Sequence, residues 1–443
     1  MKTTIQIALA FLLAGFASAQ QADISGVIMG GERPSIAIPD LRGAGGAAAH
    51  MDALNKALWD DIEDSGLFKM ASKSMYPLRA PQRPEDFRQP TPWLTEWSNA
   101  PVNAKYLAFG YSAEQGGQLL LFGWLFDVTQ TQVQGAQLLG KVYYGPVTAE
   151  GARKVAHEFA ADILKQFGGL TLLGSKVYFV SNRTGDKEIW GMEYDGSGQK
   201  PFTGYKTITT MPSVSMDGSR ISFTSYIKGS PSIVVHSLES GRRLPFYNQN
   251  ASMNAQASFT PDGKSVVYSS SATGVAQIYI AGVDGSGLRR ISSGRAIEVE
   301  PKVNPKTGNV IVFVSGRSGP QQIYKMNIDG ADVERLTPGD GQASNPSWHP
   351  DGRHIAFSWT QGYAPGNFNV FLMDVATGKY LQLTHGAGRN ENPSWAPDGR
   401  HIVFASNRSG SMQIWSMLAD GTQLRQLTTQ GRNEMPVWAK PKE

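Results

Sequence analysis

Short, continuously apolar runs separated by turn residues recur through the C-terminal part of the chain. Residues 266–268, 310–313 and 402–404 are apolar at every position. A strand with one face in water alternates apolar and polar residues, whereas a strand covered on both faces does not. We therefore expect these runs to be strands that lie between two other layers.

The apolar runs belong to a repeated unit. Residues 392–404 recur nearly unchanged at 345–357 and in a weaker form around 258–268. One position, two residues before the Pro-Asp-Gly turn in the clearest copies, recurs every 43 to 47 residues at Val214, Phe259, Val303, Trp348, Trp395 and Trp438. This period is that of one four-stranded blade of a β-propeller.

Turn residues divide each repeat into four strands. Pro-Asp-Gly is expected between the first and second strands, Asn-Arg-x-Gly between the second and third, and Asp-Gly between the third and fourth. Glycine adopts the positive φ that tight turns need, and aspartate accepts hydrogen bonds from its own turn backbone. Tight turns keep neighbouring strands antiparallel, as within a blade.

The ends of the repeat region predict how the ring closes. The last copy stops one strand into a unit, around Trp438, and the first copy starts one strand late, at residues 174–179. Pairing the C-terminal strand with the first blade removes two free sheet edges. We therefore expect residues 169–443 to form an all-β, six-bladed propeller closed by its C-terminal strand.

The region before the propeller, residues 35–168, is expected to be a small α+β domain. Leu54, Leu58 and Ile62 follow the spacing of one helix face. The expected elements are a strand at 35–39, a helix at 47–63, an extended loop at 77–92, a short helix at 93–97, strands at 106–110, 118–127 and 141–144, and a helix at 148–166.

The N-terminus has the pattern of an export signal. Lys2 precedes an apolar run at residues 5–16, and Ala17-Ser18-Ala19 follows it. These features predict a signal peptide at 1–19, cleavage between Ala19 and Gln20, and a periplasmic protein. The run is too short to span a bilayer. Residues 20–34 would then form a mature N-terminal tail, in which 20–31 could be a short edge strand or mobile.

Candidate catalytic and metal-ligating patterns are sparse. The chain has no cysteine and no Gly-x-Ser-x-Gly motif, and its seven histidines show no pair with metal-ligand spacing. The pairs Asp60-Asp61 and Glu63-Asp64 are expected on a solvated helix face. A net charge of +4 is too small and too dispersed to indicate nucleic-acid binding. We therefore predict a protein that is not an enzyme, with no cofactor and no metal.

One mouth of the propeller channel is the remaining candidate site. The residue expected just before each innermost strand differs from blade to blade: Met211, Gln256, Glu300, Asn345, Asn392 and Met435. Six identical residues would suit a symmetric ion or a phosphate, whereas an irregular polar ring suits an asymmetric protein surface. The alternative is that these residues are solvated loop tips.

Two N-terminal motifs add a family resemblance. Residues 61–68 (DIEDSGLF) and 156–163 (AHEFAADI), with the signal peptide, the small α/β domain and the propeller, resemble the TolB family, the periplasmic component of the Tol-Pal system. The resemblance implies a monomeric scaffold that bridges a Pal-like lipoprotein and a TolA-like inner-membrane protein. It also implies a role in outer-membrane invagination during division and in outer-membrane integrity, with membrane contact only through partners.

The resemblance also implies binding residues. The Glu300-Pro301 step matches the family's Pal-contacting step at the channel mouth, and the N-terminal tail corresponds by position, not by sequence, to its TolA-binding segment. The candidates are Val299, Glu300, Gln256, Asn345, Glu391, Asn392 and Glu434 at the mouth and Gln20, Gln21, Ala22, Asp23 and Ile24 in the tail. Glu300→Ala is expected to weaken binding without lowering the melting temperature. The alternative function is a sensor that binds a small molecule or carbohydrate through channel aromatics.

Overall fold

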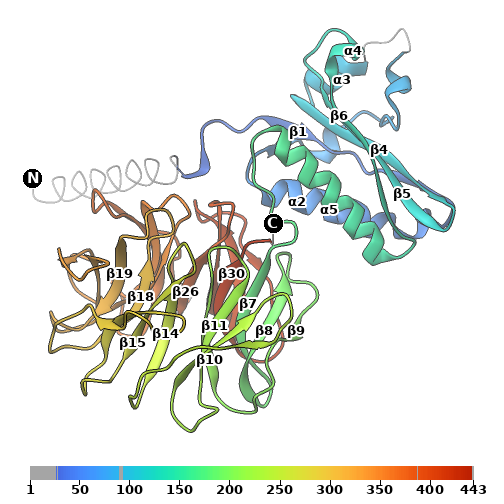
Figure 1. The fold of residues 1–443 in the computed structure, drawn as a ribbon. Helices are drawn as coiled ribbons and strands as arrows, with labels where there is room; N and C mark the ends of the chain where they lie inside the picture. Colours follow the sequence, from blue (N-terminus) through green and yellow to red (C-terminus); the bar gives the residue numbers. More distant parts are fainter. Residues whose placement is uncertain (1–25, 27, 89–92, 387, 442–443) are drawn as a thin grey trace, which may run out of the picture. The chain divides into compact units, whose positions relative to one another are not determined.

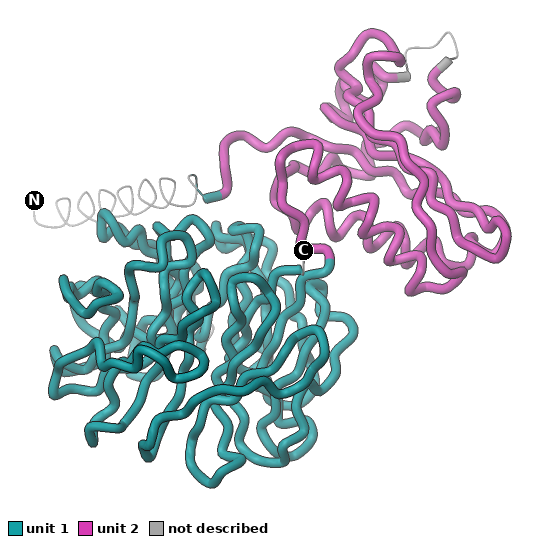
Figure 2. Tube along the Cα trace, viewed as in Figure 1, with its two compact units in different colours: residues 1–28, 174–443 teal, residues 29–173 magenta. Residues whose placement is uncertain are grey.

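The computed structural model describes residues 26, 28–88, 93–386 and 388–441. Two compact units divide this part of the chain, one spanning residues 29–173 and the other containing residues 174–443 (Figure 2). The predicted signal peptide, its cleavage site and the tail residues Gln20 to Ile24 lie outside the described residues.

A six-stranded sheet forms the centre of the N-terminal unit (Figure 1). Its strands are ordered β3-β1-β4-β5-β6, and β2 also pairs with β4. Strands β1, β2 and β3 join in parallel, whereas β4, β5 and β6 form an antiparallel meander. The bounds are β1 Ser35–Ala37, β2 Arg42–Ala44, β3 Lys69–Met70, β4 Tyr106–Gln115, β5 Gln118–Asp127 and β6 Gln137–Pro146.

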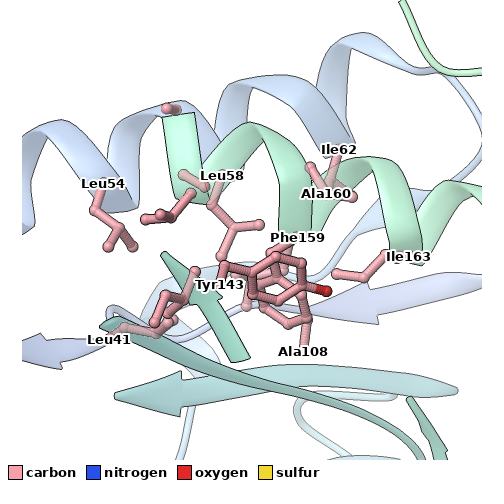
Figure 3. Packing of buried hydrophobic residues seen from close by; sticks show 14 of the residues in the cluster. Leu41, Leu54, Leu58, Ile62, Ala108, Tyr143, Phe159, Ala160 and Ile163 are labelled. Carbon is pink, nitrogen blue, oxygen red and sulfur yellow. The ribbon is translucent and has the colours of Figure 1, made fainter. Parts of the chain in front are cut away.

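Two long helices cover one face of this sheet. Helices α2 (Met51–Asp64) and α5 (Ala149–Gln166) contribute Leu54, Leu58, Ile62, Phe159 and Ile163 to a buried core (Figure 3). Strand β5 admits the Phe159 ring because it has Gly123 there: an added Cβ would lie 2.8 Å from that ring. Thr148 begins α5 by accepting a hydrogen bond from the N–H of Gly151 at 3.0 Å, as N-cap residues do.

The other face of the sheet is covered by shorter elements. Trp97, Phe87 and Val102 pack there against Phe109 and Phe126 of the sheet. The covering elements are the 3₁₀ helices η2 (Lys73–Met75) and η3 (Pro84–Arg88) and the helices α3 (Trp93–Ser98) and α4 (Val133–Ala136), while η1 (Gly45–His50) leads into α2.

Several details of this unit differ from the sequence prediction. The helix expected at 47–63 begins as the 3₁₀ helix η1 and becomes α-helical only at Met51. Asp60, Asp61, Glu63 and Asp64 were expected on a solvated face, and all four are only partly exposed. Asp61 Oδ2 lies 2.6 Å from Nδ1 of His157 on α5. Helix packing, which a single-helix pattern does not contain, buries this carboxylate.

The second unit is a six-bladed propeller, as predicted. The described residues contain six four-stranded antiparallel sheets, each ordered from the innermost to the outermost strand. The blades are β10 (Thr209–Val214), β11 (Arg220–Ser225), β12 (Ser232–Ser237) and β13 (Arg243–Leu244); β14 (Asn254–Phe259), β15 (Ser265–Ser270), β16 (Gln277–Gly282) and β17 (Arg289–Arg290); β18 (Glu298–Val303), β19 (Val310–Ser315), β20 (Gln322–Asn327) and β21 (Glu334–Arg335); β22 (Ala343–Trp348), β23 (His354–Trp359), β24 (Asn369–Asp374) and β25 (Tyr380–Gln382); β26 (Asn390–Trp395), β27 (His401–Ser409), β28 (Ser411–Leu418) and β29 (Arg425–Gln426); and β30 (Asn433–Ala439), β7 (Lys176–Thr184), β8 (Asp186–Glu193) and β9 (Lys200–Pro201).

The predicted turn and strand chemistry recurs in every clear copy. Asp262 and Asp398 each accept the N–H two residues ahead, at 3.0 and 2.9 Å. The glycines that follow them, Gly263 and Gly399, have φ of 65° and 68°. The second strands are buried on both faces, as their continuously apolar sequence predicts.

The C-terminal strand closes the ring. β30 pairs with β7 from Asn433↔Ser181 to Ala439↔Lys176. Trp438 is buried there, and its Nε1 donates to Ser175 Oγ at 2.9 Å. One blade therefore combines the two ends of the repeat region, with β30 paired to β7 along its outer edge.

Candidate functional site

A β-bulge interrupts each innermost strand at its third residue. The strand register shifts at this point in all six blades. The bulge residues share a positive φ between 52° and 57°: Met211, Gln256, Glu300, Asn345, Asn392 and Met435. Such a conformation is uncommon outside glycine. All six line one cavity of about 360 Å³ in the propeller channel.

These positions correct the sequence prediction, which placed the six residues just before the innermost strands. They lie inside the strands and are not solvated loop tips. A bulge leaves an extra residue outside the ladder and redirects its side chain. The sequence carried a signal for this arrangement, because a proline follows the bulge residue in five of the six blades, and proline within a strand is typical of a bulge.

The bulge residues of three consecutive blades are linked by hydrogen bonds. The N–H of Glu300 donates to Gln256 Oε1 at 3.2 Å, and the N–H of Asn345 donates to Glu300 Oε2 at 2.6 Å. Gln256 in turn donates its own N–H to Thr224 Oγ1 of the blade before it, at 3.2 Å. Each of these bulge amides therefore finds its acceptor in the preceding blade. Three predicted site residues thus also hold neighbouring blades together.

Glu300 and Lys302 are the charged pair of the channel wall. Burial raises the pKa of Glu300 above its ordinary value, and the hydrogen bonds from Asn345 with the nearby Lys302 ammonium offset only part of that rise. Burial also lowers the pKa of Lys302, an effect that the Glu300 carboxylate opposes. Both groups therefore ionise less readily than they would in water.

The remaining predicted mouth residues have local partners. Glu391 accepts two hydrogen bonds from Arg389 Nη2, at 2.7 and 3.0 Å. Glu434 is paired with Lys187 and accepts from Arg432 Nε at 3.2 Å. Burial alone would raise the pKa of Glu434, but these two cations hold it below its ordinary value. These two carboxylates are therefore neutralised within the chain.

Val299 and Asn392 are also internally engaged. The N–H of Asn392 donates to Ser358 Oγ at 3.1 Å. Val299 packs against the apolar core shared with the neighbouring blade. Among the predicted mouth residues, Gln256, Glu300, Asn345 and Asn392 line the cavity, whereas Val299, Glu391 and Glu434 lie one residue before the bulges and outside its lining.

The sequence prediction missed the next ring along the channel. Two residues after each bulge, the cavity is lined by Ser213, Ser258, Lys302, Ser347, Ser394 and Val437. The repeated Pro-Ser-Trp triplet was the available signal. The tryptophans of that triplet, Trp348 and Trp395, border the cavity but are less than a tenth exposed. They offer no open aromatic face for stacking a sugar.

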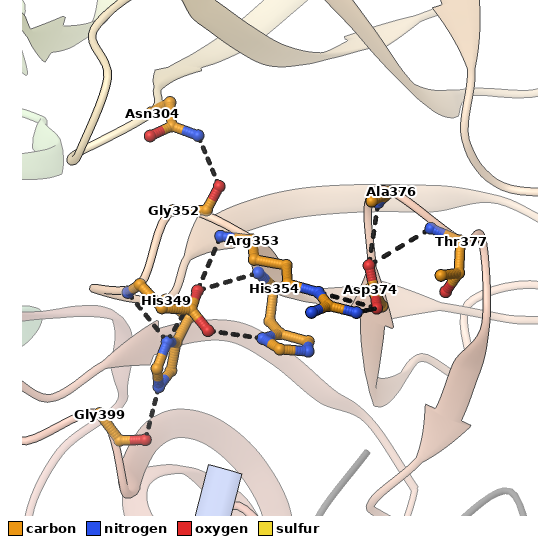
Figure 4. Close-up of polar contacts among 10 residues, drawn as sticks. Asn304, His349, Gly352, Arg353, His354, Asp374, Ala376, Thr377 and Gly399 are labelled. Atoms are coloured by element: carbon orange, nitrogen blue, oxygen red, sulfur yellow. Dashed lines mark hydrogen bonds and ion pairs between the residues drawn. The ribbon is translucent and has the colours of Figure 1, made fainter. Parts of the chain in front are cut away.

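A histidine–carboxylate cluster lies at the turn between β22 and β23 (Figure 4). Ligand atoms of His349, Asp351 and His354 lie within 4.8 Å of one another, so the prediction that no histidines have metal-ligand spacing is wrong. His354 Nδ1 lies 2.6 Å from Asp351 Oδ2. His349 Nδ1 accepts the N–H of Asp351 at 3.0 Å, and His349 Nε2 donates to Gly399 O at 2.7 Å.

The histidine–aspartate contact recurs in the next blade, where a single histidine makes it. His401 Nδ1 lies 2.6 Å from Asp398 Oδ2 at the equivalent turn of the next blade. Burial alone would raise the pKa of Asp351, but its hydrogen bonds with the two histidines hold that pKa below its ordinary value. The cluster therefore fixes the turn, and its ligand atoms are already engaged within the fold.

The fold and the channel define a class of protein: an α/β unit followed by a closed six-bladed propeller with an irregular ring of side chains in its channel. The family model described as the TolB beta propeller domain matches residues 167–363 and 338–442, which is more than half of the chain. The chain belongs to the TolB family. In the described part of the chain, no helix has the length and apolar character needed to cross a membrane.

Individual relatives match over shorter stretches. A TolB homolog of Chlorobium chlorochromatii is 32% identical over 205 residues, which are 46% of this chain and 44% of that protein. The Tol-Pal system protein TolB of Anaeromyxobacter dehalogenans is 30% identical over 283 residues, 61% of this chain and 62% of that protein. The match thus spans about half the length of these curated relatives.

A solved structure extends the likeness in fold to both units. TolB from Acinetobacter baumannii superposes with a TM-score of 0.73 and covers 92% of this chain and 97% of its own. At 24% identity the similarity concerns the fold.

Proposed function

We propose that this chain is a non-catalytic, monomeric scaffold of the Tol-Pal system in the periplasm. In this proposal the propeller mouth binds a Pal-like lipoprotein and the N-terminal tail binds a TolA-like inner-membrane protein. The protein then supports outer-membrane invagination during division and outer-membrane integrity. Family membership supports a role in the Tol-Pal system, and the surface at the channel mouth supports binding to a protein.

Exposed apolar side chains at the mouth are the observation that carries this proposal. Ile208, Tyr226, Ile227, Val275 and Ile297 are all at least 37% exposed, and Ile297 reaches 53%. The hydrogen bonds Tyr226 N→Ile208 O and Glu298 N→Ala276 O place their loops beside the N-terminal ends of the innermost strands. Apolar side chains that gather on a surface are typical of a protein-binding site.

A group of ion-paired residues lies in a different part of the mouth. Arg389, Glu391, Arg432, Glu434 and Lys187 belong to the blades built on β26 and β30, whereas the apolar residues belong to those built on β10, β14 and β18. We call the side with these exposed apolar residues the apolar half of the mouth, although Lys206, Lys228 and Arg295 are exposed in the same loops. Such an asymmetric surface favours one orientation of a protein partner and does not suit a symmetric ion.

Calorimetry with the soluble domain of the Pal-like lipoprotein from the same bacterium tests the proposal. Wild-type chain is expected to bind, and Glu300→Gln is expected to bind at least tenfold more weakly, because it loses a charge-assisted contact but keeps a hydrogen-bond acceptor. Glu334→Gln, on the outermost strand of the same blade, is the control and should bind as wild type. Absence of wild-type binding would reject the proposed partner.

A second measurement addresses the tail. Pulldown with the periplasmic domain of the TolA-like protein should recover the processed wild-type chain but not a chain that lacks residues 20–25. Equal recovery of both chains would reject the tail as the binding segment.

A further inference from the structure

The ring of side chains two residues after the bulges contains an arc of hydrogen-bond donors. Ser258, Lys302, Ser347 and Ser394 occupy equivalent positions in four consecutive blades, and all four line the channel cavity. They lie two residues after the bulge residues proposed to bind a protein and line the same cavity as four of them.

Each of the three serine hydroxyls already accepts one backbone hydrogen bond. Ser258 Oγ accepts the N–H of Val303 at 3.2 Å, Ser347 Oγ accepts that of Trp395 at 3.4 Å, and Ser394 Oγ accepts that of Trp438 at 3.2 Å. Within the described residues, none of the three hydroxyls donates a hydrogen bond. Since a hydroxyl is both acceptor and donor, each retains a proton to offer to the cavity.

Lys302 adds a cation to the same arc. Its ammonium makes no hydrogen bond and no ion pair with any residue that the structure describes, although burial lowers its pKa. Lys302 is only partly exposed, and a partly buried charge without a hydrogen-bonded partner is unfavourable. The nearest opposite charge in the cavity lining is the Glu300 carboxylate, which makes no direct ion pair with this ammonium in the described residues.

The Glu300 carboxylate offsets this charge in part, but its hydrogen bonds are made to the next blade. Glu300 Oε2 is occupied by the N–H of Asn345 at 2.6 Å, and Asn345 Nδ2 lies 3.3 Å from Oε1. The charged residues of the lining are Glu300, Lys302 and Lys440, so cations outnumber carboxylates. The channel wall therefore favours an added negative charge, with Glu300 as the group that opposes it.

We propose that the propeller channel binds a small oxyanion, a carboxylate or phosphate group, on the Lys302 ammonium and the hydroxyls of Ser258, Ser347 and Ser394. Oxyanions accept several charge-assisted hydrogen bonds at once, which matches donors that converge from four blades. The cavity of about 360 Å³ has ample room, since one water occupies about 30 Å³ of liquid.

Calorimetric titration of the full chain with inorganic phosphate and with acetate tests this site. Ionic strength is held constant with chloride. Wild-type protein is expected to bind at least one of the two anions in the millimolar range or tighter. Lys302→Met should weaken that binding at least tenfold. Lys306→Met, an exposed lysine of the same blade, is the matched control and should leave it unchanged.

A second variant guards against a folding defect. Lys302→Arg keeps the cation and should keep anion binding within a few-fold of wild type, and circular dichroism verifies that each variant is folded. The site is rejected if wild type binds neither anion, or if folded Lys302→Met binds as wild type does. Both measurements omit the lipoprotein, so their outcome is independent of the partner proposed above.

A competition experiment distinguishes two sources of the oxyanion. If phosphate weakens lipoprotein binding to wild type but not to Lys302→Met, a carboxylate of the bound protein occupies the site. If phosphate binds without affecting the lipoprotein, the ligand is a free small anion. Both results support the site and assign its natural occupant.

Discussion

Glu300 in one blade accepts the backbone N–H of Asn345 in the next blade at 2.6 Å. Glu300, the residue proposed as the principal partner contact, thus also links two blades. A substitution there changes both binding and stability unless the acceptor is retained.

Glu300→Ala is therefore expected to destabilise the propeller, contrary to the sequence-based expectation of an unchanged melting temperature. Removing the acceptor leaves the N–H of Asn345 unpaired in the channel wall, at a cost of about 1–3 kcal/mol. Glu300→Gln retains an acceptor and should melt close to wild type. Thermal denaturation of the three proteins measures this difference, and an alanine variant as stable as wild type would contradict the link.

The apolar half of the mouth makes a separate prediction. Ile297 is 53% exposed, so its side chain contributes little to the core. Ile297→Asp should weaken lipoprotein binding by about 1–3 kcal/mol, because it puts a charge into an apolar contact, while stability stays within about 0.5 kcal/mol of wild type. Val333→Asp, on the turn before β21, is the matched control. Equal affinities for wild type and Ile297→Asp would exclude this half of the mouth.

Ring closure depends on Trp438. Trp438→Ala should lower the free energy of unfolding by about 3–5 kcal/mol, because it removes a large buried side chain between the first and last strands of the ring. Trp438→Phe should cost less, since it keeps most of the packing and loses mainly the hydrogen bond to Ser175. Denaturant unfolding compares the two, and a small effect of the alanine variant would argue against closure by this strand.

Stability should depend on pH through Glu434. Its folded-state pKa lies below its ordinary value of 4.5, so the ionised carboxylate stabilises the fold above that pH, and this stabilisation is lost as the pH falls. Glu434→Gln should be less stable than wild type by about 1–2 kcal/mol at neutral pH. The difference should shrink in acid, where wild type is protonated. Urea unfolding at several pH values tests this, and a constant difference would be inconsistent with the ion pair.

The core of the N-terminal unit has little room at Gly123. Gly123→Ala would put a Cβ 2.8 Å from the Phe159 ring and should destabilise the unit by about 1–3 kcal/mol. Gly135→Ala is the control, because nothing lies within 4 Å of its added Cβ and the residue is helical. Thermal unfolding should separate the two variants, and similar melting temperatures would show that the helix layer adapts.

The sequence by itself determined the repeat period, the turn positions, the buried second strands and the closure by residues around Trp438. These features follow from local chemistry: a Pro-Asp-Gly turn and a continuously apolar strand each specify their own conformation. The family resemblance and the positions of Gln256, Glu300 and Asn345 on the channel were likewise accessible from the sequence.

The tertiary structure decided how those residues act. The packing of neighbouring blades brings Glu300 to the N–H of Asn345, and ring closure pairs Glu434 with Lys187. The assembled channel places Lys302 and three serines of other blades on one cavity. The burial of Asp61 against His157 depends in the same way on the packing of two helices. Each of these contacts joins residues far apart in the chain, and their geometry exists only once the elements have packed.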